Sequence, residues 1–220
     1  MAYHRTERSE RVRQATRGRI LKAARKLFAK RGFTATTMQD IVEASGTSIG
    51  TVYFYFEDKT DLLRTLLEGA LTAAWARGDE IMARTPAGPR KLAVMAYATT
   101  LGLLVHDRDL TRLIAGVETH APVQLRLVEL NTPRVRAALR ESFPDRPTDQ
   151  IELAVAAWAG TARYGVRLGA SDEAGLEPRN VAAFIVRWNL RGVGVPEDEI
   201  DDAIAFADQA FAAGEGPTGA

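Results

Sequence analysis

Hydroxyl and aromatic side chains gather in one short stretch of this chain, from Ser48 to Tyr55. The stretch follows a tight turn, Ser45-Gly46-Thr47, in which Gly46 lets the backbone turn without a Cβ clash. Two short helices joined by such a glycine-containing turn form a helix-turn-helix, whose second helix fits the major groove of DNA. The chemistry of such a helix is hydrogen bonding and apolar contact with base edges. The pattern therefore predicts DNA reading.

Three predicted helices position this stretch. The first covers about residues 14–30, where apolar side chains recur at the spacing of one helical face and bases fill the other. Thr37 can cap a short second helix, and Ser48 can cap a third that ends near Phe56. A long fourth helix, over residues 59–84, follows and leads to a clear breaker, Thr85-Pro86-Ala87-Gly88-Pro89.

Three apolar residues, Ile41, Val42 and Val52, would pack together and fix the angle between the second and third helices. Their burial leaves an outward face. The candidates for that face are Ser48, Ile49, Thr51, Tyr53 and Phe54.

Charge is distributed unevenly along the chain. Residues 1–60 carry 12 Lys and Arg against 6 acids, whereas the other 160 residues carry 17 bases against 22 acids. A basic end on an acidic body indicates a polyanionic partner at that end, although a solvated basic helix would explain the charge alone equally well. Residues 1–14 are expected to form a flexible basic arm, which either reaches phosphates or an adjacent minor groove or serves as a solubilising tail.

Composition excludes several other classes. The chain has 220 residues with 46% hydrophobic and 26% charged content, which is ordinary for a globular protein. It has no cysteine, and its longest apolar stretch, residues 92–105, is shorter than the roughly 20 residues of a membrane span. No nucleophile, phosphate-loop or dinucleotide motif is present, and its three histidines are scattered, so we expect no enzyme activity, no metal and no cofactor.

The run ILKAA at residues 20–24, followed by LFAKRGFTATTMQDIVEASGTSIGTVYFYFEDK at 27–59, closely resembles the N-terminal signature of the TetR family of bacterial repressors. The resemblance covers about residues 15–65 in its caps, core positions and turn. It implies that Thr37 and Tyr53 contact phosphates and that Lys59 opens the fourth helix facing a phosphate. Together with the outward face of the third helix, the full set of predicted DNA contacts is Thr37, Thr47, Ser48, Ile49, Gly50, Thr51, Tyr53, Phe54, Tyr55 and Lys59.

Two positions of this set depart from the commoner family pattern. Ile49 stands where Lys or Arg is frequent, and Phe54 stands where Arg or His is frequent. Neither side chain can donate a hydrogen bond. One hypothesis is that one of them contacts a thymine methyl group, and the alternative is that both pack against their own domain.

The rest of the chain is predicted to be a larger all-α domain, so that the fold class is all-α throughout. Its helical patterns cover about residues 90–106, 110–120, 123–143, 149–168, 179–191 and 196–213. The predicted organisation is an arm at 1–14, a helix-turn-helix domain at 15–62, an effector-binding and dimerisation domain at 63–213, and a disordered tail at 214–220.

Resemblance to the family implies an effector pocket and a dimer interface in this larger domain. The pocket candidates are Trp75, Met95, Tyr97, Leu101, His120, Leu127, Trp158, Arg163 and Tyr164, for each of which core packing is the plainer explanation. Small residues over 149–169 would let two helices approach closely, either across a two-fold axis or within one chain. The interface candidates are Ala154, Ala157, Gly165, Gly169, Phe184, Ile185 and Trp188.

The resemblance implies a homodimeric repressor that a small, largely apolar organic effector releases from a palindromic double-stranded DNA operator. It also implies a cytoplasmic bacterial protein that is associated with the nucleoid through DNA and needs no membrane. Two alternatives remain open at this point. One is an activator of the same family, and the other is a helical adaptor that binds protein without DNA specificity.

Overall fold

The computed structural model describes residues 7–105, 111, 121–171 and 175–212, without the side chains of residues 7 and 121–128. All regular elements in these ranges are α-helices, which confirms the all-α fold class. Contacts divide the chain into one unit that ends at Leu67 and a second that begins at Glu68. The predicted helix over 110–120 and the predicted tail lie outside the described residues, apart from Thr111.

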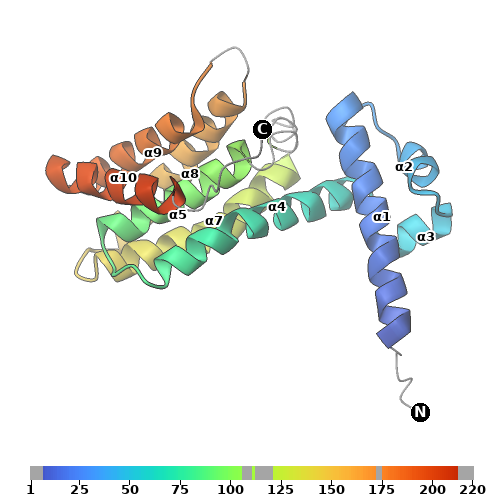
Figure 1. Cartoon of the computed structure of the whole chain (residues 1–220), viewed down its shortest axis with the longest axis horizontal. Helices are drawn as coiled ribbons and strands as arrows, with labels where there is room; N and C mark the ends of the chain where they lie inside the picture. The colour runs from blue at the N-terminus through green and yellow to red at the C-terminus, as the bar shows by residue number, and fades with distance from the viewer. Residues whose placement is uncertain (1–6, 106–110, 112–120, 172–174, 213–220) are drawn as a thin grey trace. The chain divides into compact units, whose positions relative to one another are not determined.

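The first unit contains α1 (Glu7–Arg31), α2 (Met38–Ser45), α3 (Ile49–Tyr55) and the start of α4 (Lys59–Met82). In Figure 1, α2 and α3 follow one side of the long α1. The expected flexible arm is wrong for residues 7–14, since these residues form the first two turns of α1. The core of the first unit is apolar and fully buried. It consists of Ile20, Ala24, Phe28, Ile41, Val52, Phe56, Leu62 and Leu63.

Local hydrogen bonds fix the ends of α2 and α3. The Thr37 hydroxyl accepts from the Asp40 backbone N–H at 3.1 Å, while the Asp40 carboxylate accepts from the Thr37 N–H at 2.8 Å, which completes a capping box. Gly46 ends α2 in the left-handed region, with φ at 64°, and its N–H donates to carbonyls of the last turn. Ser48 then caps α3 by accepting from the Thr51 N–H at 3.1 Å.

The second unit is built around α5 (Pro89–Leu104), which is buried along nearly its whole length. Pro89 stands in the first turn, where its missing N–H leaves no unsatisfied donor. Four further helices pack on α5, as Figure 1 shows. They are α7 (Ala121–Ser142), α8 (Thr148–Ala170), α9 (Pro178–Gly192) and α10 (Glu197–Ala212).

Helices α4 and α5 cross without a layer of side chains between them. A Cβ at Gly102 would lie 2.2 Å from the Cβ of Ala74, and a Cβ at Gly78 would lie 2.3 Å from the Cβ of Ala98. At the residues that directly follow Ala74 and Ala98, the indole Nε1 of Trp75 donates to Oγ1 of Thr99 at 3.1 Å. Glycine is therefore required at both crossing points.

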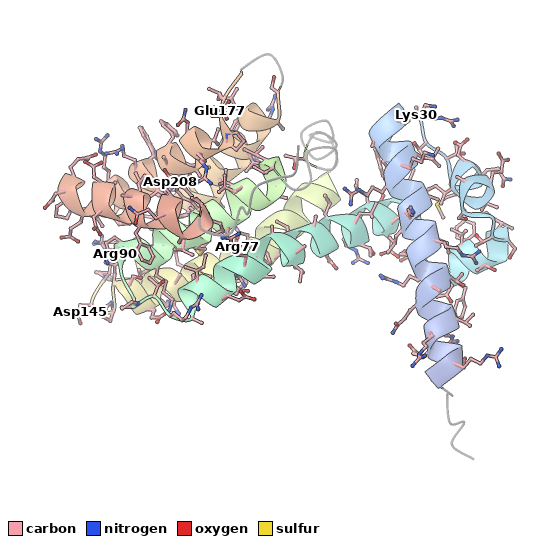
Figure 2. All side chains as sticks on the ribbon, in the orientation of Figure 1. Lys30, Arg77, Arg90, Asp145, Glu177 and Asp208 are labelled. Carbon is pink, nitrogen blue, oxygen red and sulfur yellow. The ribbon has the colours of Figure 1, made fainter. Side chains whose placement is uncertain are left out.

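Polar contacts tie the second half of α4 to α10. The guanidinium of Arg77, labelled in Figure 2, donates to the carbonyls of Ala210 and Phe211 at 3.1 and 3.2 Å. These carbonyls belong to the last turn of α10, where the helix itself leaves them without a partner. Across the described residues, none of the helices combines the length and the apolar content of a membrane span.

Candidate nucleic-acid interface

Helix α3 buries one apolar side chain and exposes three large side chains. Val52 is fully buried, whereas Ile49, Tyr53 and Phe54 are 45%, 52% and 66% exposed. The side chains of Ile49 and Phe54 are therefore only partly covered by their own domain, in which the Phe54 ring contacts Arg13 and Tyr55, and the thymine-methyl contact stays a prediction. Exposed apolar side chains clustered on a short helix indicate a contact surface.

The hydroxyl groups predicted to meet DNA are engaged in caps and turns. The Thr37 hydroxyl donates to the Asp40 carboxylate at 2.6 Å, and the hydroxyls of Ser48 and Thr51 lie 2.8 Å apart. The Thr47 hydroxyl lies 2.8 Å from that of Ser45. These contacts orient the starts of α2 and α3, so the hydroxyls hold the recognition surface in shape. Gly50 is exposed and Tyr55 half-buried beside them.

Electrostatics reinforce the α2 cap. The Thr37 hydroxyl and then the Thr37 backbone N–H hold the pKa of the Asp40 carboxyl below its usual range, and Arg31 adds to the effect. The guanidinium of Arg31 lies 3.1 Å from this carboxylate. A carboxylate in the first turn also suits the positive end of the helix dipole.

Lys59 has a different role from the predicted one. Its ammonium donates to the carbonyls of Phe33 and Thr36, both at 2.7 Å, and to that of Thr34 at 3.3 Å. It also lies 4.5 Å from the centroid of the Phe33 ring, and burial lowers its pKa. The prediction of a phosphate-facing ammonium is therefore wrong for this structure, because the ammonium holds together the connection between α1 and α2.

Two arginines outside the predicted set contact the third helix and the residue that ends it. The guanidinium carbon of Arg13 lies 5.5 Å from the centroid of the Phe54 ring, and that of Arg17 lies 5.3 Å from the centroid of the Phe56 ring. Both residues come from α1. A spacing of four residues in a helix could have indicated that they share a face, but nothing in the sequence names their ring partners.

The pocket candidates fall into separate places in the second unit. Met95 and Trp158 line a small cavity that has room for about one water molecule. Its other lining residues are Ala96, Thr99, Thr100, Asn131, Val135, Ala162 and Ile185.

Of the remaining pocket candidates, the five with described side chains do not line this cavity. Trp75, Tyr97 and Leu101 are buried in the core, where burial first and the Asp208 carboxylate second raise the pKa of the Tyr97 phenol. Arg163 and Tyr164 are exposed on α8. His120 and the side chain of Leu127 lie outside the described residues.

Three of the predicted interface residues pack against other residues of the same chain. Ile185 is fully buried and lines the cavity. A Cβ at Gly165 would lie 2.8 Å from Cδ1 of Ile185, and a Cβ at Gly169 would lie 2.7 Å from Cδ1 of Leu104. These two glycines therefore serve close packing inside one chain, which corrects their assignment to a partner.

Other predicted interface residues form an exposed apolar surface on α8 and α9. Phe184 and Trp188 are 61% and 59% exposed, and their rings stack with centroids 6.1 Å apart. Ala157 is exposed on α8, and Ala154 is half-buried. We call the whole set of exposed apolar residues on these helices the α8–α9 face, and its large members are Leu153, Tyr164, Leu168, Phe184 and Trp188.

Comparison with known proteins agrees with the geometry of the first unit. Residues 20–66 match the sequence model of a family described as "Bacterial regulatory proteins, tetR family". The chain is 39% identical over 61 residues to the HTH-type transcriptional regulator TtgR of Pseudomonas putida, and these residues are 28% of this chain and 29% of that protein. It is 38% identical over 69 residues to the HTH-type transcriptional repressor KstR2 of Mycobacterium tuberculosis, which are 31% of this chain and 34% of that protein. The aligned segments therefore span about a third of these relatives' lengths.

Similarity in fold extends over nearly the whole chain. The crystal structure of RolR in complex with its ligand resorcinol superposes with a TM-score of 0.61 and covers 90% of this chain and 96% of that protein, at 23% sequence identity. At that identity the likeness concerns the fold. The likeness in fold therefore includes the second unit, whereas the likeness in sequence is concentrated in the first unit.

Proposed function

This chain belongs, through its N-terminal unit, to the tetR family of bacterial regulatory proteins, and from that premise we propose that it is a DNA-binding transcriptional regulator. One observation carries the proposal. Capped helices α2 and α3 meet at the left-handed Gly46, and α3 presents Ile49, Tyr53 and Phe54 to solvent. A helix with an open side-chain surface that is braced by a second helix is the arrangement that enters a major groove.

We further propose that the protein acts as a homodimeric repressor. The α8–α9 face supports this, because clustered aromatic and aliphatic side chains on two adjacent helices suit a self-complementary, two-fold interface. A second copy of this chain is the occupant we propose for the face. Two recognition helices that are related by such an axis would read half-sites about 34–36 Å apart on a palindromic operator.

The cavity in the second unit supports a small effector. Its lining is mostly apolar, with Trp158 and Met95 as the large members, and the hydroxyls of Thr99 and Thr100 and the Asn131 amide supply polar groups. In this structure the cavity has room for about one water molecule, so an effector would have to widen it. We propose a compact, largely apolar organic effector that favours a conformation with lower DNA affinity.

A gel shift tests the core of the proposal. The full chain is incubated at low salt, without added small molecules, with DNA fragments that flank its own gene. We expect a shift that unlabelled fragment removes and an equal mass of random DNA does not. Tyr53→Ala should weaken binding at least tenfold, whereas Leu176→Ala, at an exposed apolar residue of the second unit outside the α8–α9 face, should not. A failure to bind any flanking fragment with preference would rule out the regulator.

Sedimentation velocity tests the dimer separately. We expect the wild type to sediment as a dimer at micromolar concentration and Trp188→Asp to shift it towards monomer, because a buried charge without a partner is costly at an apolar interface. The control is Val12→Asp, which adds the same charge at an exposed apolar residue of α1. Equal sedimentation of both variants would rule out the α8–α9 face as the interface.

A further inference from the structure

The helix-turn-helix of this chain is acidic. No Lys or Arg occurs between Arg31 and Lys59, and this stretch carries the acids Asp40, Glu43, Glu57 and Asp58. Affinity for duplex DNA comes largely from lysine and arginine side chains that neutralise phosphates. The positive charge at the DNA surface must therefore come from outside α2 and α3.

The two bases that flank this stretch are already engaged. Arg31 pairs with the Asp40 carboxylate at 3.1 Å. The Lys59 ammonium donates to three backbone carbonyls. Neither residue is placed to supply the missing charge without giving up a contact that holds α2. Arg64 of α4 pairs with the Asp61 carboxylate, so the remaining source in the first unit is α1.

Helix α1 brings two arginines onto the aromatic end of the helix-turn-helix. Arg13 and Arg17 lie on the stripe that continues through Ile20 and Ala24, since these spacings of four, three and four residues keep one face of a helix. Ile20 and Ala24 are fully buried against the rest of the unit. The same stripe therefore leaves the core at the exposed Arg17 and continues to the half-buried Arg13.

The ring contacts place Arg13 beside the exposed part of α3. Its guanidinium carbon lies 5.5 Å from the centroid of Phe54, within the range of about 6 Å for a cation–π contact. Phe54 is 66% exposed, so the guanidinium shares its ring with solvent. A guanidinium that rests on a ring face keeps its N–H groups directed outward, and these groups match the geometry of a phosphate.

Phe54 stands near the C-terminal end of α3, whose residues are Ile49–Tyr55. In a helix-turn-helix the N-terminal residues of the recognition helix approach the base edges, so its C-terminal end lies nearer the backbone at the rim of the groove. On the basis of the proposed function, we infer that Arg13 binds a DNA phosphate beside the recognition helix and that Phe54 positions its guanidinium. Helix α1 thus supplies the cation that α3 lacks.

The test uses duplexes that the wild-type chain selects from a random-sequence library, together with an unselected random duplex. The dissociation constant is measured against KCl concentration for the wild type, Arg13→Ala, Phe54→Ala and the double variant. Arg19→Ala is the matched control, because it removes the same charge from the opposite side of α1. Thermal unfolding of each variant checks that the fold is kept.

Removal of Arg13 should weaken binding to selected and random duplexes alike, by about tenfold at 0.1 M salt, and should lower the slope of log affinity against log salt by about 1. Arg19→Ala should change affinity less than threefold. Arg13→Ala and Phe54→Ala disable the same contact. The double variant should therefore lose clearly less binding free energy than the sum of the losses in the two single variants.

Three results would overturn the inference. An Arg13→Ala variant that behaves like Arg19→Ala would remove the phosphate contact, and one that changes the selected sequence without changing the salt slope would make Arg13 a base reader. Strict additivity of Arg13→Ala and Phe54→Ala would remove the positioning role of the ring. In all three cases, selection of a preferred duplex by the wild type leaves the proposed function intact, whereas failure to select any duplex refutes that function itself.

Discussion

Replacement of Lys59 separates a structural role from a DNA-contacting one. The two strong contacts of its ammonium, to the carbonyls of Phe33 and Thr36, are both 2.7 Å long. Hydrogen bonds to charged groups contribute about 1.5–3 kcal/mol each. Lys59 is only half-buried, so water can replace part of this, and we expect Lys59→Met to cost about 1.5–3 kcal/mol in total.

Hydrogen exchange of the full chain measures this locally, because all three tryptophans lie outside the first unit and would report on the second. A loss of about 1.5–3 kcal/mol corresponds to about 10- to 150-fold faster exchange of the protected amides in α1 and α2. Methionine keeps the length and apolar stem of lysine. Lys22→Met, which removes an exposed lysine of α1, is the control and should leave exchange unchanged.

The opposite result has a clear meaning. Suppose that the amides of Lys59→Met exchange within threefold of the rates in Lys22→Met, and that the variant binds DNA tenfold more weakly. The ammonium then serves a phosphate, and its role as a clamp that holds together the connection between α1 and α2 is refuted. Faster exchange together with DNA binding that recovers at lower temperature would instead agree with the clamp, since binding then fails because the unit unfolds.

Three further predictions concern caps, pH and packing. Thr37→Ala should destabilise the first unit by about 1 kcal/mol through loss of the α2 cap, seen as faster exchange confined to α1–α3; unchanged exchange would contradict the capping box. Because the folded pKa of Asp40 is depressed, the unfolded chain binds more protons below about pH 4, so stability is lost as pH falls through that range and Asp40→Asn should flatten this loss in acid titrations. Gly102→Ala should lower the free energy of unfolding by about 1–3 kcal/mol because its Cβ would collide with Ala74, whereas Gly69→Ala, with open space around it, should raise it by about 0.5–1 kcal/mol in urea titrations.

Features with local causes could be predicted from the sequence. The caps at Thr37 and Ser48 and the turn at Gly46 depend on residues within four positions, and their side-chain chemistry admits few alternatives. The exposure of Tyr53 follows from the burial of Val52 one position earlier. The presence of the helices could be predicted for the same reason.

Features that depend on distant contacts could not be predicted. The partners of Lys59 lie 23 to 26 residues away, so nothing near position 59 distinguishes a clamp from a phosphate ligand. Small residues such as Gly165 fit a close contact within one chain as well as one between two chains. The start of α1 was missed because bases and acids in residues 7–14 show no apolar periodicity.

The crossing of α4 and α5 has a mechanical consequence. Where two helices meet through long side chains, a small displacement of one is absorbed as those side chains change rotamer. Ala74 and Gly102 meet as backbone and Cβ atoms, which have no rotamers to change. Because α5 also supplies Met95 and Thr99 to the cavity wall, any molecule that pushes this wall outward should move the second half of α4 as one rigid piece. A probe attached to α4 near Gly78 would then report occupancy of the cavity without touching it.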